Sequence, residues 1–307
     1  MVGQNQPCDV DRSGDDRDRL EVAHITAAPP PECVDGRPDF HHVADCENTP
    51  PFGETCDIFD TCNEYDHDLT GTRISASGPI EVFGGHTCAY VPNNAQACDH
   101  LEEQLAPVET WGSDYVGAPM GDGGIGGLNI VRVVAAFDDT AVTVDPAQGG
   151  IAGGPLQAGE FLEFQATTPF HVQANHAVMV AQYLVGQYTG TPPAARGDPA
   201  MAVLAPAEQY RSDYTFILPT SYNPGTNGQN YLLVIRPPGL AITLDGAPVA
   251  ASFQAIAGRE IGAVPLAGGT HHIAAAEPFG VIVYGLGSFT SYATLAGLDL
   301  EPITIIP

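Results

Sequence analysis

The feature that most constrains the fold of this chain is an eleven-residue motif that occurs twice. LAPVETWGSDY spans Leu105–Tyr115 and LAPAEQYRSDY spans Leu204–Tyr214, with seven identical positions. The similarity extends beyond the motif. A strand-like segment precedes each copy, and an apolar strand, a Thr-centred strand, a Gly-marked segment and a Pro-Phe dipeptide with a final strand follow it. Because such self-similarity is typical of duplicated structural units, we predict a unit of about 100 residues that is built twice.

From Asp68 onward, short apolar segments alternate with turns rich in Gly, Pro, Asn and Asp. Such segments include NIVRVVAAF, TAVTVD, YTFILP, YLLVIR and FGVIVYG. Their length and their content of β-branched and aromatic residues favour strands at the spacing of a sandwich or barrel. We expect an all-β protein with two tandem, internally duplicated β-sandwich-like units at 70–172 and 173–307. A Cys-rich, irregular, acidic extension covers 1–69, and one short helix is expected at 97–105.

Several residue types recur at matching positions of the two motif copies. The proline of each copy fixes φ at the entry to a strand, and the Ser-Asp pair is suited to a turn. The favoured interpretation is a repeated structural corner, and the alternative is a repeated binding site. The candidate site residues are Trp111, Ser113, Asp114 and Tyr115 in the first copy, and Tyr210, Ser212, Asp213 and Tyr214 in the second.

The charge of the chain excludes several functions. There are 37 acidic residues against 10 basic ones, all of them Arg, which gives a net charge of −27. A field this negative repels nucleic acid and anionic membranes. The lack of Lys excludes a Schiff-base lysine, a P-loop lysine and a Ser-Lys pair. Because no apolar run reaches about 18 residues, we expect no membrane-spanning segment.

All seven cysteines lie in the first third of the chain, which favours disulfides and an oxidising compartment. Proximity alone suggests three pairs, with Cys8 left over. The N-terminus lacks the apolar region of a signal peptide, so if the protein is secreted, we expect this sequence to be its mature form. The proposed pairs are Cys33–Cys46, Cys56–Cys62 and Cys88–Cys98.

Four segments resemble the N-terminal domain family of the IgGFc-binding protein. They are DLTGTRISASGPIEVFGGHTCAYVP, ACDHLEEQLAPVETWGSDY, GDPAMAVLAPAEQYRSDYTFILPTSY and PFGVIVYGLGSFTSYATLAGLDL. The resemblance covers about 68–301 and is greatest to a bacterial branch of secreted or surface proteins in myxobacteria-like organisms. It implies an extracellular binding role and no catalytic residues. Because no mucin-like modules follow, it does not by itself imply binding to Fc.

One candidate for metal binding is the acidic segment DVDRSGDDRD. Asp9, Asp11, Ser13 and Asp15 place oxygen ligands at alternate positions around a glycine, as in the opening of a calcium loop. The glutamate expected at the twelfth position is absent, since Leu20 stands there. The alternatives are a calcium site and a solvated acidic arm.

A second candidate lies in GGHTCAYVPNNAQACDHLEEQ, which carries zinc-ligand residue types at His86, Cys88, Cys98, His100 and Glu103. A Cys pair with nine residues between its members in a secreted β-protein favours a disulfide over zinc. His100 and Glu103 would then share a face of the short helix.

Two further motifs are best explained by structure. Arg196-Gly197-Asp198 spells an integrin-type tripeptide but also suits a turn before a strand. His271 and His272 are expected on opposite faces of a strand, because side chains alternate there. No G-x-S-x-G, H-E-x-x-H or S-x-x-K motif accompanies them.

These observations favour a non-enzymatic extracellular protein for binding or adhesion, secreted or on the cell surface. The partner is expected to be an extracellular protein or glycan, with self-assembly as a further option. One alternative is a structural subunit of a surface layer or filament that pairs through exposed strand edges. The other is a secreted hydrolase, which would need paired carboxylates or a nucleophile and base in a deep pocket.

Overall fold

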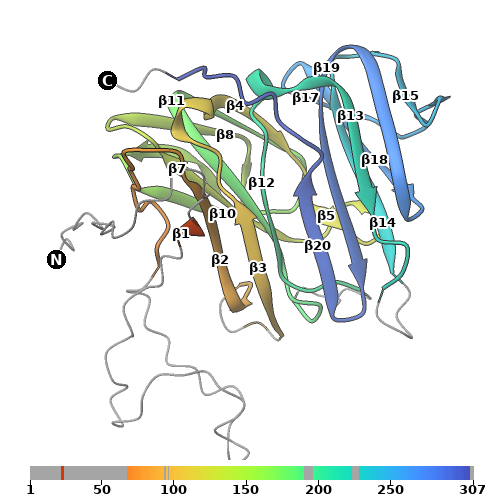
Figure 1. Ribbon diagram of the computed structural model, residues 1–307, viewed down its shortest axis with the longest axis horizontal. Helices are drawn as coiled ribbons and strands as arrows, with labels where there is room; N and C mark the ends of the chain where they lie inside the picture. Colours follow the sequence, from red (N-terminus) through yellow and green to blue (C-terminus); the bar gives the residue numbers. More distant parts are fainter. Residues whose placement is uncertain are drawn as a thin grey trace, which may run out of the picture.

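The computed structural model describes residues 22–23, 68–92, 95, 97–189, 196–222 and 228–304. This part of the chain is almost entirely β-strand, with two short 3-10 helices, η3 (Val108–Thr110) and η4 (Ala207–Gln209). The expected all-β fold is therefore confirmed. Figure 1 shows two β-units side by side, the first mainly in yellow and green and the second in cyan and blue.

The first unit is a seven-stranded antiparallel sheet built around β11 (Phe170–Leu184). A register shift between Gln173 and Val178 bends β11, so that it pairs with β8 before the shift and with β7 and β12 after it. β9 also contacts β10, which curls the sheet toward a barrel. The other strands are β4 (Gly112–Gly117), β7 (Asn129–Ala135), β8 (Thr140–Gln148), β9 (Ile151–Leu156), β10 (Phe161–Ala166) and β12 (Ala200–Val203).

The second unit repeats this plan with eight strands around β19 (Gly269–Gly287). β13 and β15 pair with the first half of β19, and β14 and β20 pair with its second half. In order along the chain, β4, β7, β8, β10 and β11 therefore correspond to β13, β14, β15, β18 and β19, and the predicted duplication is confirmed. The remaining bounds are β13 (Arg211–Leu218), β14 (Gln229–Arg236), β15 (Ile242–Leu244), β16 (Ala247–Pro248), β17 (Gln254–Ile256), β18 (Arg259–Leu266) and β20 (Thr290–Leu295).

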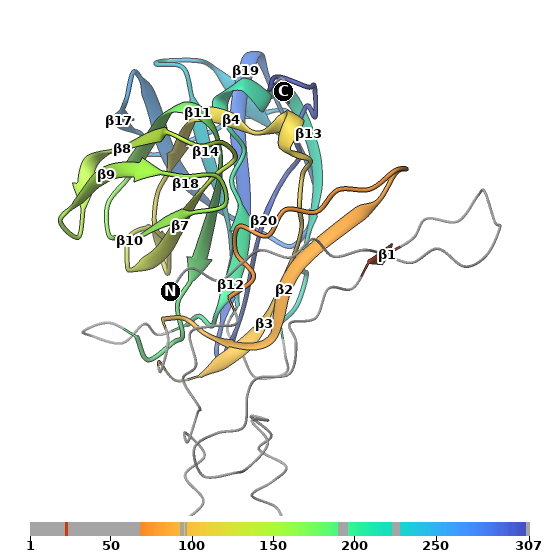
Figure 2. The same cartoon turned by 90° about the vertical axis from the view of Figure 1, so that its left-hand side faces the viewer.

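A separate sheet of β1 (Val22–Ala23), β2 (Glu81–Tyr90) and β3 (Cys98–Gln104) precedes the first unit, and Figure 2 shows β2 and β3 as a long hairpin. The helix expected at 97–105 is wrong, because this segment is strand β3. A disulfide between Cys88 and Cys98 joins β3 to β2, so tertiary context overrides the helical preference of the segment. A short hairpin, β5 (Met120–Gly121) with β6 (Gly124–Ile125), follows β4.

The hydrophobic core explains why β14 reads as an unbroken apolar run. Leu232 and Val234 belong to a cluster inside the second unit, whereas Leu233 and Ile235 belong to a larger cluster shared with the first unit. Both faces of β14 are therefore buried, which is the condition that produces a continuous rather than an alternating apolar pattern. One face of the second unit serves as the surface on which the first unit packs.

The expected boundary at 172/173 lies inside β11. The two Pro-Phe dipeptides also occupy different places in their units. Phe170 pairs with the last residue of β4, whereas Phe279 pairs with Arg211, the first residue of β13. The residue that pairs with the start of β4 is Val178, so Val178 is the counterpart of Phe279.

Candidate functional site

Each copy of the motif folds as a proline-led corner followed by a strand. Pro107 and Pro206 precede η3 and η4 with nearly identical backbone angles, φ −63° and ψ 150° against φ −67° and ψ 154°. Because proline fixes φ, it sets the direction in which the chain enters the corner. Trp111 and Tyr210 end the two corners and lead into β4 and β13.

Tyr115 and Tyr214 make the same two hydrogen bonds in their units. Each hydroxyl accepts a hydrogen bond from the backbone N–H three residues earlier, at 3.2 Å for Tyr115 and 2.8 Å for Tyr214. It then donates to a carbonyl of the long central strand, that of Val178 on β11 or of Phe279 on β19. Burial raises the pKa of both hydroxyls, to about 12 for Tyr214, so each stays a neutral donor.

Asp114 is the centre of the junction between the two units. Its carboxylate accepts two hydrogen bonds from Arg259 of β18, at 3.0 and 2.7 Å, and lies 2.9 Å from Nε2 of His171 on β11. Burial raises the pKa of Asp114, but the hydrogen bonds from His171 and Arg259 outweigh burial and lower it to about 2. The carboxylate is therefore charged at neutral pH and joins three strands from both units.

The second copy of the motif also contacts the first directly. Glu208 accepts hydrogen bonds from the backbone N–H and the hydroxyl of Ser113, at 3.0 and 3.1 Å. The side chain of Gln209 donates to the carbonyl of Thr110 at 3.1 Å. Side chains of η4 thus provide hydrogen-bond partners for Ser113, at the start of β4, and for Thr110, just before it.

The outer face of β4 is buried beneath the second unit. Val116 and Ala118 are 1% and 0% exposed and belong to the same core cluster as Ile261 of β18. Val116 lies on the same face of β4 as Asp114, because side chains alternate along a strand, and Ala118 follows just beyond the end of β4. The second unit and the core shared with it therefore cover the Ser113 N–H, the Asp114 carboxylate and the Val116 side chain of the first copy.

The second copy of the motif lies in different surroundings. Asp213 lies 2.7 Å from Nε2 of His272, and their side chains are 59% and 54% exposed. This pair corresponds to Asp114 and His171 in position. No arginine bonds to Asp213 within the described part of the chain, and Ser212 beside it is exposed.

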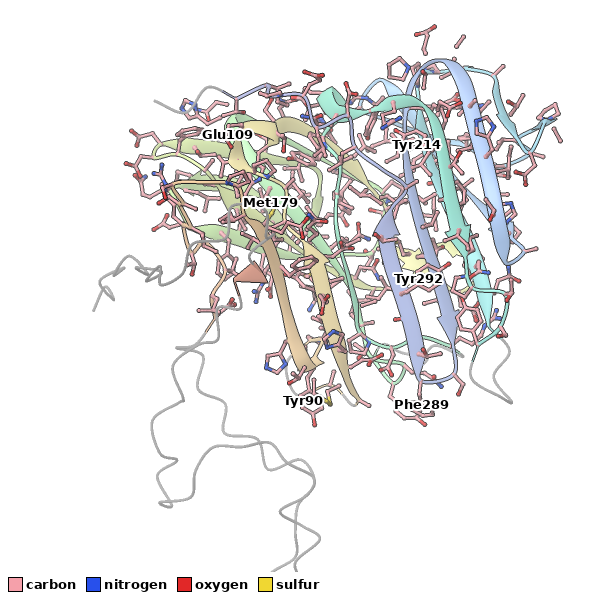
Figure 3. The ribbon with its side chains drawn as sticks, viewed as in Figure 1. Tyr90, Glu109, Met179, Tyr214, Phe289 and Tyr292 are labelled. Carbon is pink, nitrogen blue, oxygen red and sulfur yellow. A yellow bond between two sulfur atoms is a disulfide. The ribbon has the colours of Figure 1, made fainter. Side chains whose placement is uncertain are left out.

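The last described residues return to the first copy of the motif. The backbone N–H groups of Ile303 and Thr304 donate to the carbonyl of Glu109 at 2.8 and 2.9 Å, and the Thr304 hydroxyl donates to the carbonyl of Trp111. Figure 3 places Glu109 and Tyr214 toward one end of the molecule, away from Tyr90 and Phe289 at the other. Both copies of the motif therefore meet at one end.

His271 and His272 lie on opposite sides of β19, as expected from alternation. The His271 side chain is 10% exposed, packs on Phe216 and lies 2.7 Å from Asp245. His272 lies on the exposed side with Asp213. Each histidine is held by a carboxylate, which orients the ring within the sheet.

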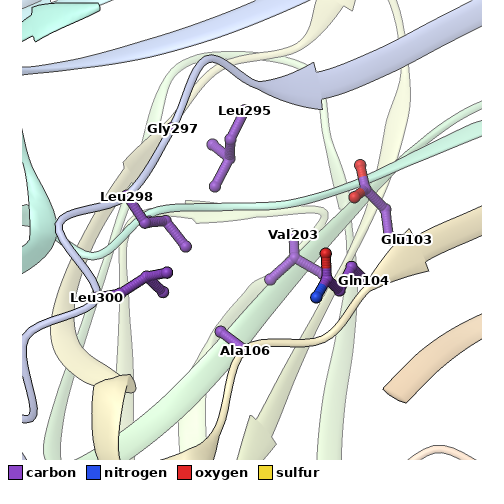
Figure 4. Close-up of a pocket in the computed structure, with 8 residues that line it drawn as sticks. All are labelled: Glu103, Gln104, Ala106, Val203, Leu295, Gly297, Leu298 and Leu300. Carbon is purple, nitrogen blue, oxygen red and sulfur yellow. The ribbon is translucent and has the colours of Figure 1, made fainter. Parts of the chain in front are cut away.

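A cavity of about 180 Å³ lies between β3, β12 and the segment after β20, as Figure 4 shows. Among the described residues that line it, Glu103 alone carries a carboxylate. Burial raises the pKa of Glu103 to about 7, although a hydrogen bond from Thr294 opposes the shift. No second titratable group accompanies Glu103 for acid–base chemistry among these described lining residues. The residues lining it are Glu103, Gln104, Ala106, Val203, Leu295, Gly297, Leu298 and Leu300.

The tripeptide at 196–198 does not form an exposed loop that an integrin could bind. Arg196 forms an ion pair with Asp122, and Asp198 is 4% exposed. Burial and the neighbouring charge of Asp99 raise the pKa of Asp198 to about 7. The integrin interpretation is therefore wrong, since the acidic side chain of the tripeptide is not accessible.

The disulfide between Cys88 and Cys98, with a Cα–Cα distance of 5.0 Å, confirms one expected pair and excludes zinc binding by these thiols. His100 lies on a strand, where it bonds to Glu102 rather than sharing a helical face with Glu103. In the described residues no cluster of three or more metal-ligating side chains occurs. No helix there is long and apolar enough to cross a membrane. The other candidates lie outside the described residues: Asp9, Asp11, Ser13, Asp15, Cys33, Cys46, Cys56 and Cys62.

Sequence reasoning did not select three residues of the junction: His171, Glu208 and Arg259. Glu208 is identical in both copies of the motif, which was a usable signal. Arg259 carried a weaker one, since it is one of only ten basic residues in an acidic chain. His171 had none, because its partner Asp114 lies 57 positions away.

Comparison with known proteins identifies relatives of this chain. Residues 53–285 match the family described as IgGFc binding protein. The human IgGFc-binding protein is 28% identical over 238 residues, which is 75% of this chain and 4% of the human protein. The chain thus spans a small fraction of that relative's length. No solved structure matches the chain.

Proposed function

Since the chain belongs to the IgGFc-binding protein family, we propose that it is an extracellular, non-enzymatic protein that binds another extracellular protein or a glycan. The family match over residues 53–285 carries this proposal. The proposal includes secretion or display at the cell surface and a role in adhesion. The bacterial branch of the family stays a prediction.

The architecture supports a binding role. Two β-units share one core, and ion pairs and hydrogen bonds fix the junction between them. A rigid scaffold of this kind presents loops and strand edges at low entropic cost to recognition. The described carboxylate–histidine pairs hold strands together and have no serine or cysteine nucleophile bonded to them.

The first test is binding of the full chain to immobilised human IgG, its Fc and Fab fragments, mucins and glycans. The name of the human relative makes Fc the first ligand to try. The protein is attached through its N-terminus, because the chain has no Lys. Saturable binding to any one surface supports the proposal, and Fab serves as the matched control for Fc. Absence of binding across the panel would count against it.

We also propose calcium as a cofactor of the acidic segment that contains Asp9, Asp11, Ser13 and Asp15. Each binding measurement is therefore repeated with calcium and with a chelator. Binding that disappears with the chelator supports a metal-dependent ligand site. Equal binding in both conditions removes calcium from recognition. Calorimetric titration of the free protein with calcium tests the metal site itself.

A further inference from the structure

The strand β13 has one unpaired edge in the described part of the chain. Its backbone pairs with β19 alone. On β19, the carbonyl of His272 accepts from Asp245 N–H, and the His272 N–H donates to the Asp245 side chain, so this residue bonds on the side of β15. Thr215, which lies opposite His272, must then direct its own N–H and C=O away from β19. The same holds for Ile217, two residues further on.

The side chains at this edge are also exposed to solvent. Ile217 is 76% exposed, the largest value among the exposed large apolar residues of the described chain, and Thr215 is exposed beside it. Their counterparts in the first copy, Val116 of β4 and Ala118 just after it, are fully buried in the core that both units share. The fold therefore covers this surface in the first unit and leaves it open in the second.

Charge does not protect the second half of β13. Natural sheet edges avoid pairing with other edges through charged side chains, prolines or bulges. Arg211 and Asp213 lie at the bulged start of β13, whereas 214–218 reads YTFIL and carries no charge. The unprotected part is also rich in residues with high β-propensity.

We propose that β13 is a self-association edge, at which two copies of this chain pair antiparallel about a two-fold axis. With the axis at Phe216, Thr215 of each copy faces Ile217 of the other. Two such pairs give four backbone hydrogen bonds and two cross-strand contacts between β-branched side chains. The interface is isologous, so it closes at a dimer.

The charge pattern fits a second copy in this register. The axis at Phe216 places Asp213 opposite Pro219 of the second copy, so no like charges meet across the pairing. The net charge of −27 on each copy opposes association at long range. Salt screens that repulsion, so dimer formation should strengthen as ionic strength rises.

The test is sedimentation velocity of the full chain from about 1 µM to about 1 mM, a range that covers weak edge-paired dimers. The wild type should shift from monomer to dimer with concentration, at lower concentration in higher salt. Thr215→Pro removes one outward N–H without touching the bonds to β19, and Ile217→Lys adds an edge charge; each should weaken dimerisation at least about tenfold. Circular dichroism confirms that both variants fold.

Thr270→Lys is the matched control, because Thr270 pairs with Ile217 on β19 but does not lie on the edge. It should leave dimerisation unchanged. A wild type that stays monomeric throughout would overturn the proposal. So would a dimer that both β13 variants leave intact, or one that Thr270→Lys weakens as much as Ile217→Lys does, since contact would then lie elsewhere or on the sheet face.

Discussion

Asp114 and Asp213 occupy the same position in the two copies of the motif, and each lies beside a histidine of its own central strand. Asp114 is also covered by Arg259 of the other unit, whereas Asp213 faces solvent. The local corner is therefore a property of the eleven residues. The surroundings of the two aspartates differ, because Asp114 lies at the junction with the second unit and Asp213 does not.

The largest test of this contrast replaces the two aspartates in turn. Asp114→Ala should destabilise the protein by about 2 kcal/mol, because it leaves Arg259 partly buried without its partner. Asp213→Ala should cost less than about 0.5 kcal/mol, because exposed ion pairs contribute little. Urea unfolding followed by the fluorescence of Trp111, the single tryptophan, measures both. Equal losses of unfolding free energy would mean that the position of Asp114 at the junction adds nothing to its contribution to stability.

The tyrosines should respond alike, in contrast to the aspartates. Tyr115→Phe and Tyr214→Phe each remove the hydroxyl and leave a buried carbonyl of the central strand without its donor. Each should cost about 1–2 kcal/mol. Thermal unfolding by circular dichroism compares them. A loss confined to one copy would contradict the view that the corner is built twice in the same way.

The contribution of Asp114 to stability should also depend on pH. The pKa of Asp114 is about 2 in the folded protein, below the ordinary value of 3.8, so its stabilisation is complete above about pH 4 and is lost as the pH falls toward 2. The difference in unfolding free energy between wild type and Asp114→Asn should therefore shrink by about 1 kcal/mol over that range. Asp213→Asn, which lies outside the junction, is measured in parallel as the matched variant.

The smallest expected effect separates the two glutamates of the motif. Glu208→Gln weakens the bonds to Ser113 and should cost about 0.5–1 kcal/mol. Glu109→Gln should be neutral, since the described part of the returning C-terminal segment bonds to Glu109 through its backbone carbonyl and not through its side chain. Denaturant titration of both variants in parallel measures the two losses of unfolding free energy. A larger loss for Glu109→Gln would show that its side chain holds the segment.

Most of the architecture was predictable, because the repeated motif and the short apolar segments can be read directly from the sequence. The helix expected at 97–105 failed because pairing with β2 and the disulfide to Cys88 override the helical preference of the segment itself. The match of Pro169-Phe170 with Pro278-Phe279 failed for a similar reason. The bulges in β11 and β19 shift the register, and only the pairing partners show that Val178 is the counterpart of Phe279.

The junction was less predictable than the fold. Asp114 was selected as a repeated residue, but nothing in the eleven letters distinguishes it from Asp213. The difference arises from Arg259, 145 positions away, which reaches one copy and not the other. Two identical sequence positions can thus have different energetics because one of them lies at an interface that only the assembled chain creates.

The return of the chain to the first corner has a consequence for biosynthesis. The bond from Thr304 to the carbonyl of Trp111 spans 193 positions. At ordinary elongation rates of about 5–20 residues per second, the first corner leaves the ribosome about ten seconds or more before its last partner has been made. During that interval the carbonyls of Glu109 and Trp111 have only water or a chaperone as partners, so the second unit completes the folding of the first.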